Sequence, residues 1–181
     1  MWRTFALLIF CLIFSKTTYG DSYSHKYIDD KVKRGELPEY CSYMGVDRKT
    51  RTPLGQLYRE TYGPDWIHMH HYCWALADFQ RGLDSQAIAN LDYVLKASSI
   101  DFKLRPMVLY QKATILTVNK RYPEAASVYS EIIQISPEDE NAYVALANLF
   151  LLQGNNRMAR QVAEQGLKIM PNSDRLKIIA K

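Results

Sequence analysis

From residue 66 onwards, hydrophobic positions recur at the three- and four-residue spacing of amphipathic helices, separated by short polar turns. The pattern repeats with a period of 34 residues when residues 106–139 are aligned with residues 140–173. An earlier copy in residues 66–99 fits when Gly82 is aligned with Gly154. The positions that match are Ala75, Ala113 and Ala147 in the first helix, Ala87, Ala125 and Ala159 in the second, and Pro137 and Pro171 after it. The pattern predicts an all-α protein built from three helical hairpins.

The flanking segments do not repeat. Residues 174–181 contain the amphipathic stretch RLKIIA, which predicts a capping helix over the open end of the array. Residues 21–65, called the cover segment below, predict two short helices that end at Gly35 and Gly63, with an extended stretch around Pro38 between them. Residues 47–53 form a charged loop, for which a solvated turn is the simplest explanation. We therefore expect the cover segment to fold back onto the first hairpin.

The small residues and closing prolines at these positions resemble the tetratricopeptide repeat family, most closely in the last two copies. The resemblance implies a right-handed α-α superhelix of three hairpins, with a C-terminal cap helix and a non-repetitive N-terminal extension. In this family the first helices of the hairpins line a concave groove that binds a peptide or a helix of a partner protein. The groove positions that the resemblance implies are Tyr72, Phe79, Met107, Tyr110, Thr114, Asn141, Val144, Asn148 and Leu151.

Residues 1–20 have the pattern of a secretory signal peptide. Arg3 precedes an unbroken apolar run from Phe5 to Phe14, and Thr18 and Gly20 fit a cleavage site. The run is shorter than the ~20 residues that span a bilayer, although an uncleaved N-terminal anchor is the alternative. A group of exported bacterial proteins with a His-His-Tyr-Cys stretch ahead of such repeats is also similar. We expect a periplasmic or secreted protein.

Export changes the interpretation of the cysteines. Cleavage after Gly20 would leave Cys41 and Cys73, which have one possible intramolecular pairing in an oxidising compartment. We therefore predict a disulfide between Cys41 and Cys73.

Composition excludes some classes of function. The chain has 23 Lys and Arg against 19 Asp and Glu, which is too balanced for a dedicated nucleic-acid-binding protein. No nucleophile elbow, phosphate loop or paired acidic motif is present, so we expect neither an enzyme nor a cofactor. The tyrosines and tryptophans between residues 40 and 74 are expected to pack the cover segment onto the first hairpin, and a carbohydrate or ligand platform is the alternative.

His68, His70 and His71 lie close to Cys73 and suggest a metal or haem site. On a regular helix, however, His68 and His71 share one face, whereas His70 and Cys73 share another. One metal ion cannot collect all four, so structural histidines are the simpler interpretation. His71 is expected to be buried, neutral and hydrogen-bonded to the cover segment.

These features favour an exported protein–protein interaction scaffold of the bacterial periplasm or cell envelope, either free or in a membrane-associated complex. The alternative is a metal- or haem-handling protein that uses the histidine-rich helix, and a hydrolase or isomerase built into the cover segment is a third hypothesis. The sequence does not specify the partner or the oligomeric state.

Overall fold

The computed structural model describes residues 25–44 and 51–181, and in this part of the chain all regular secondary structure is helical, with no β-strand. The prediction of an all-α repeat fold is therefore confirmed. The predicted signal peptide and most of the charged loop lie outside the described residues. The cover segment and its junction form α1 (His25–Lys33), η1 (Glu39–Tyr43), α2 (Pro53–Tyr62) and η3 (Pro64–His68), where η marks a 3₁₀ helix.

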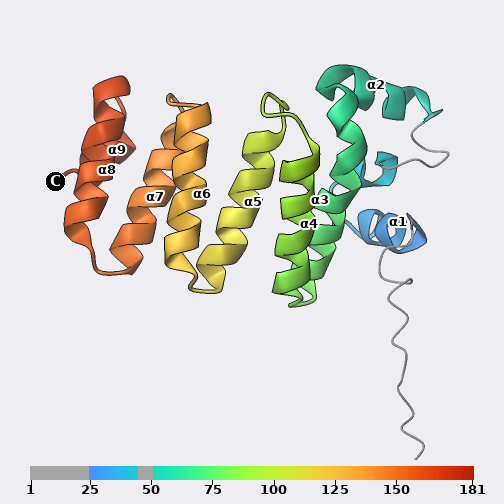
Figure 1. Ribbon diagram of the computed structural model, residues 1–181, viewed down its shortest axis with the longest axis horizontal. Coiled ribbons are helices and arrows are strands. Elements are labelled where there is room, and N and C mark those ends of the chain that lie inside the picture. Colours follow the sequence, from blue (N-terminus) through green and yellow to red (C-terminus); the bar gives the residue numbers. More distant parts are fainter. Residues whose placement is uncertain (1–24, 45–50) are drawn as a thin grey trace, which may run out of the picture.

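Three helical hairpins follow and stand side by side in a row, with α1 and α2 at the α3 end (Figure 1). Each hairpin packs against the next, and a short last helix packs on the third hairpin. Their helices are α3 (Met69–Gln80) and α4 (Asp84–Ala97), α5 (Arg105–Val118) and α6 (Tyr122–Ile135), α7 (Glu140–Leu152) and α8 (Asn156–Ile169), and α9 (Asp174–Ile179). Within these described residues no helix is long and apolar enough to cross a membrane.

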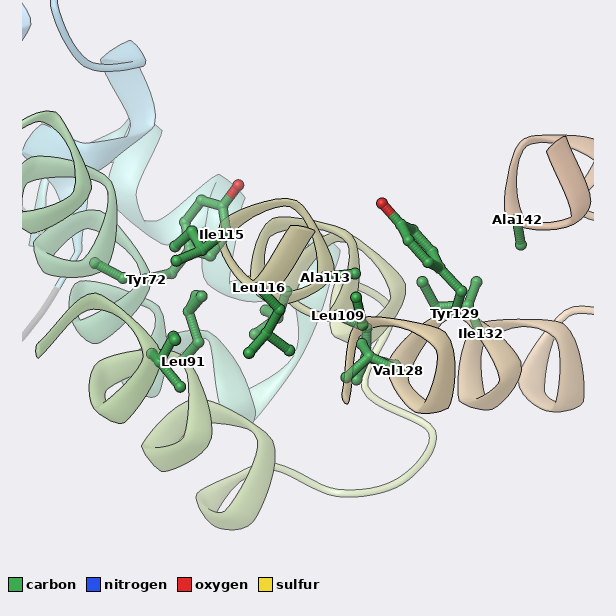
Figure 2. Packing of buried hydrophobic residues seen from close by; sticks show 14 of the residues in the cluster. Tyr72, Leu91, Leu109, Ala113, Ile115, Leu116, Val128, Tyr129, Ile132 and Ala142 are labelled. Atoms are coloured by element: carbon green, nitrogen blue, oxygen red, sulfur yellow. The ribbon is translucent and has the colours of Figure 1, made fainter. Parts of the chain in front are cut away.

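The repeated alanines lie where helices approach each other most closely. All six are fully buried, because a larger side chain would hold the two helices of a hairpin apart. Leucine, isoleucine and valine side chains fill the space between these contacts, and Figure 2 shows Leu91, Leu116, Leu109 and Ile132 following one another in this order across the array. The hydrophobic core is thus continuous from one hairpin to the next, as a repeat array requires.

The turn inside each hairpin needs a residue in the left-handed region. Gly82 and Gly154 supply it in the first and third hairpins, with φ of 71° and 70°. The second hairpin has Lys120 at the equivalent position, with φ of 58°. A lysine is strained there because its Cβ crowds the backbone, whereas glycine is not.

The cap is fitted closely to the last hairpin. Leu176 of α9 is fully buried and reaches the surface of α8 at Gly166. A Cβ at Gly166 would lie 2.7 Å from Leu176 Cδ1 and 3.0 Å from the ring of Tyr143, so the absence of a side chain permits this contact.

The cover segment is attached to the first hairpin by a disulfide between Cys41 of η1 and Cys73 of α3, whose side chains are both buried. At the far end of α3, Gln80 Nε2 donates to the carbonyl of Glu36 at 2.6 Å, and Lys31 Nζ donates to Gln80 Oε1 at 3.0 Å. The predicted disulfide is thus present, and polar contacts fix the orientation of the segment around it.

The opposite end of the cover segment is held to the linker between the first two hairpins. Asp65 accepts hydrogen bonds from the backbone N–H of Ser99, at 2.9 Å, and from its hydroxyl. These bonds lower the pKa of Asp65. Lys103 Nζ donates to the carbonyl of Thr61 at 2.7 Å. The described residues of the cover segment are therefore held both to the end of α3 and to the linker between the first two hairpins.

Candidate functional site

The first helix of the first hairpin is largely withdrawn from the predicted groove. Tyr72 of α3 is 5% exposed, and its hydroxyl shares a hydrogen bond with Tyr40 of η1. Burial, together with Tyr40, raises the pKa of Tyr72. Phe79 packs partly buried against the core. The cover segment therefore encloses Tyr72, which is not available to a partner.

In the second hairpin the predicted positions change from buried to exposed along α5. Met107 and Tyr110 are partly buried against the core, whereas Thr114 is exposed. Tyr110 is also engaged within the protein, because its hydroxyl donates to Asp139 Oδ2 at 2.8 Å. Burial and this hydrogen bond raise the pKa of Tyr110, so it acts as a neutral donor that joins α5 to the start of α7.

The third hairpin shows the same trend along α7. Val144 is only 8% exposed, and the exposed Asn141 accepts a hydrogen bond from Arg175 Nη1 of the cap at 2.7 Å. Asn148 and Leu151, one and two turns further on, are exposed. The geometry leaves the second half of α7 accessible and its first half occupied by protein contacts.

On α5 and α7, two strongly exposed hydrophobic residues were not among the predicted positions. Val118 at the end of α5 is 62% exposed, and Leu152 at the end of α7 is 66% exposed. They are one 34-residue period apart, as are Thr114 and Asn148, so the periodicity itself could have identified them. The structure therefore presents one exposed set on two successive first helices, called the α5–α7 surface below. It consists of Thr114, Val118, Asn148, Leu151 and Leu152.

The histidines form an aromatic cluster rather than two separate pairs. The ring centroids of His70 and His71 are 4.4 Å apart, and both rings lie edge-on to Trp74 at 4.7 and 4.6 Å. His71 also lies 3.9 Å from the ring of Tyr93, which contacts His68 at 5.8 Å. His70 and His71 were assigned to different faces of the helix, yet their rings lie close together because both residues also contact Trp74.

His71 is hydrogen-bonded to α4, not to the cover segment as predicted. Its Nδ1 lies 2.7 Å from Asn90 Oδ1, and Asn90 Nδ2 donates to Asp78 Oδ2 at 3.0 Å. Asp78 is buried, and Arg81 lies 3.8 Å from its other oxygen. Partial burial lowers the pKa of His71 despite the bond to Asn90, and the charge of His68 lowers it further. The neutral ring therefore donates from Nδ1 and joins the two helices of the first hairpin.

This geometry does not support the hypothesis of a metal site. Among the described residues, no three His, Cys, Asp or Glu side chains are grouped so that they could hold a metal ion. The sulfur atoms of Cys41 and Cys73 are joined to each other and so offer no thiolate ligand. His70 Nδ1 is bound to the carbonyl of Ile67 at 2.6 Å, which fixes the orientation of the ring on its own helix turn.

Comparisons with known proteins agree with the repeat architecture. Residues 118–181 match the model of the tetratricopeptide repeat. Among solved structures, the chain is similar to a tetratricopeptide repeat protein from Parabacteroides merdae ATCC 43184, with a TM-score of 0.57 and 17% sequence identity. That alignment covers 88% of this chain and 58% of the other, so the chain spans little more than half the length of that protein. At this identity the likeness shows the fold alone. No curated protein matches.

Proposed function

We propose that this chain, which has the fold of a tetratricopeptide repeat protein and matches the repeat model over residues 118–181, is a protein–protein interaction scaffold that binds an extended segment or helix of a partner on the α5–α7 surface. Repeats of this family generally mediate contacts between proteins. The proposed partner engages the second and third hairpins, since the cover segment encloses Tyr72 in the first.

The observation that carries this proposal is the repetition of an exposed apolar residue at one repeat position. Val118 and Leu152 are 62% and 66% exposed at the ends of α5 and α7, and Leu151 beside them is 42% exposed. Burying such side chains is favourable by about 25 cal/mol per Å² of apolar surface. A partner that covered all three would therefore gain the free energy of burying three apolar side chains.

The polar members of the surface suit the same kind of partner. Asn148 carries an amide that can both donate and accept, which is the requirement for hydrogen bonding to an exposed backbone. Thr114 Oγ1 donates to the carbonyl of Tyr110 at 2.9 Å and retains acceptor capacity. The α5–α7 surface contains no charged residue, so the recognised segment is expected to be uncharged and apolar where it lies against it.

The proposed site of action is outside the cytoplasm, in the bacterial periplasm or cell envelope. The support is the signal-like pattern of residues 1–20, together with a disulfide, since disulfides persist in oxidising compartments. Labelling of the free thiols after expression from the native start codon tests this location. We expect Cys41 and Cys73 of protein in the extracytoplasmic fraction to react with the label only after reduction. Protein in the cytoplasm whose cysteines react without reduction would contradict this location.

The binding proposal is tested by charge substitutions on the α5–α7 surface. In the double variant Val118→Asp and Leu152→Asp, partner binding would have to bury two carboxylates, and removing each of them from water costs free energy. The matched control is Ile100→Asp in the linker, since Ile100 is 68% exposed and is not on this surface. The full chain is cross-linked in the cells that produce it, and the recovered partner is quantified by mass spectrometry.

We expect recovery of one specific partner to fall at least tenfold in the double variant and to be unchanged in Ile100→Asp. Circular dichroism melting confirms that both variants remain folded. Equal recovery of the same partner by all three proteins would refute binding at this surface.

A further inference from the structure

An open hollow lies beside α9, in the part of the array where α8 and α9 stand at the opposite end of the row from α1 and α2 (Figure 1). Its volume is about 510 Å³. A cavity of about 150 Å³ holds a benzene ring, so this hollow has room for several side chains. The lining residues are Leu167, Asp174, Lys177, Ile178, Ala180 and Lys181.

The 34-residue period shows what occupies the equivalent place in the third hairpin. The α9 face corresponds to a face of α7 on which α8 packs as the second helix of the hairpin. A Cβ at Gly166 of α8 would lie 3.0 Å from the ring of Tyr143, which is the counterpart of Lys177. The hollow therefore corresponds to the place of a second helix. The counterparts of Lys177, Ile178, Ala180 and Lys181 are Tyr143, Val144, Leu146 and Ala147, which are all 8% exposed or less.

Ile178 distinguishes this end of the array from a simple polar cap. Terminal repeats have polar outer faces that keep an open end soluble, and the exposed Lys177 and Lys181 meet that requirement. Ile178 does not, because its side chain is 69% exposed, the largest value among the exposed large hydrophobic residues that the structure describes. Leu167 of α8 adds a second apolar side chain to the lining. Covering both would remove apolar surface from water, which is favourable.

The surroundings of the hollow are basic. Residues 156–181 contain six Lys and Arg side chains and two Asp and Glu side chains, an excess of four positive charges. In the lining, the carboxylate of Asp174 lies 3.5 Å from Lys177 Nζ. Arg160 Nη2 donates to the carbonyl of Lys181 at 2.9 Å, which brings a further cation to the rim. An acidic partner is therefore attracted to this end, whereas a second copy of the same end is repelled.

We propose that the hollow binds an amphipathic helix of a partner protein that carries acidic side chains beside its apolar face. The helix would lie on α9 as α8 lies on α7, with apolar side chains against Ile178 and Leu167 and carboxylates towards Lys177 and Lys181. Docking of an apolar helix face into a groove is a common mode of recognition. None of the lining residues belongs to the α5–α7 surface, so this is a second interaction surface, beyond the proposed function.

The test uses a peptide derived from α8, the helix that occupies the equivalent place on α7. The acidic probe has the sequence of residues 155–170 with Arg157→Glu, Arg160→Glu and Lys168→Glu. The control peptide keeps the original sequence, so the two differ in charge and share the same apolar face. Both are blocked at their termini and labelled with fluorescein, and binding to the full chain is measured by fluorescence anisotropy.

Variants of the full chain separate the apolar contact from the charges. Ile178→Asp changes the apolar contact, and its matched control is Ile100→Asp, since Ile100 is 68% exposed and does not line the hollow. The double variant Lys177→Glu and Lys181→Glu reverses the charge of the lining. Circular dichroism melting confirms that each variant remains folded.

We expect the full chain to bind the acidic peptide saturably and the control peptide at least tenfold more weakly. Ile178→Asp should weaken binding of the acidic peptide at least tenfold, and Ile100→Asp should leave it unchanged. The double lysine variant should prefer the control peptide, because the charges on both sides of the contact are then reversed.

The absence of saturable binding of the acidic peptide would overturn the inference, as would equal affinity for the two peptides or binding that Ile178→Asp does not weaken. Two results would assign the hollow to another occupant and would also overturn it. A dimer in sedimentation velocity that Ile178→Asp dissociates would indicate a second copy of this chain. Capture by phosphatidylglycerol vesicles that Ile178→Asp abolishes would indicate a membrane surface. The proposed function can fail separately, since its test depends on Val118 and Leu152, neither of which lines the hollow.

Discussion

The disulfide between Cys41 and Cys73 is predicted to provide a large share of the stability of the fold, and its contribution can be calculated from the chain. The two cysteines are 32 residues apart in sequence. In the loop-closure model a cross-link of this span removes about 12 cal/mol/K from the entropy of the unfolded chain, which is about 3.7 kcal/mol at 25 °C. For a domain of this size that corresponds to a fall of roughly 7–15 °C in the melting temperature when the bond is lost.

The perturbation is the double substitution Cys41→Ala and Cys73→Ala, measured by urea denaturation and thermal melting. Wild-type protein with a strong reductant is the matched control, because it loses the bond and keeps both side chains. We expect both samples to lose about 3–4 kcal/mol and the double variant to be insensitive to the reductant. A loss below about 1 kcal/mol in both would refute the entropic argument and show that the polar contacts of Lys31, Gln80 and Asp65 hold the cover segment unaided.

Two further predictions concern the repeats. Lys120→Gly should raise the free energy of unfolding by about 1 kcal/mol, because Lys120 holds φ at 58° where Gly154 occupies the equivalent turn, and a lower melting temperature would contradict this. Protein stability should also fall as the pH is lowered below about 6.5, since the pKa of His71 is depressed in the folded state and the unfolded state therefore binds the proton more readily. His71→Gln should flatten the dependence of the melting temperature on pH between 8 and 5, and an unchanged slope would show that other groups cause it.

The repeats and the cover helices could be predicted because their signals are local. Alanines at a 34-residue spacing identify the hairpin contacts, and Gly35 and Gly63, with φ of 73° and 83°, end α1 and α2 as their sequence positions predict. The disulfide followed from counting cysteines. The helices and turns depend on residues that are close in sequence, and the disulfide followed because only one pairing of two cysteines is possible. Neither prediction required knowledge of tertiary packing.

The candidate site was predicted less well because it depends on contacts between distant segments. The burial of Tyr72 requires Tyr40 to fold over it, and no periodic pattern in the cover segment predicts that. The partner of His71 is Asn90, 19 residues away on α4, whereas the cover segment was the predicted partner. Val118 and Leu152 are a different case. They occupy the same position in successive repeats, so the sequence could have identified them, but that position was not among the predicted groove positions.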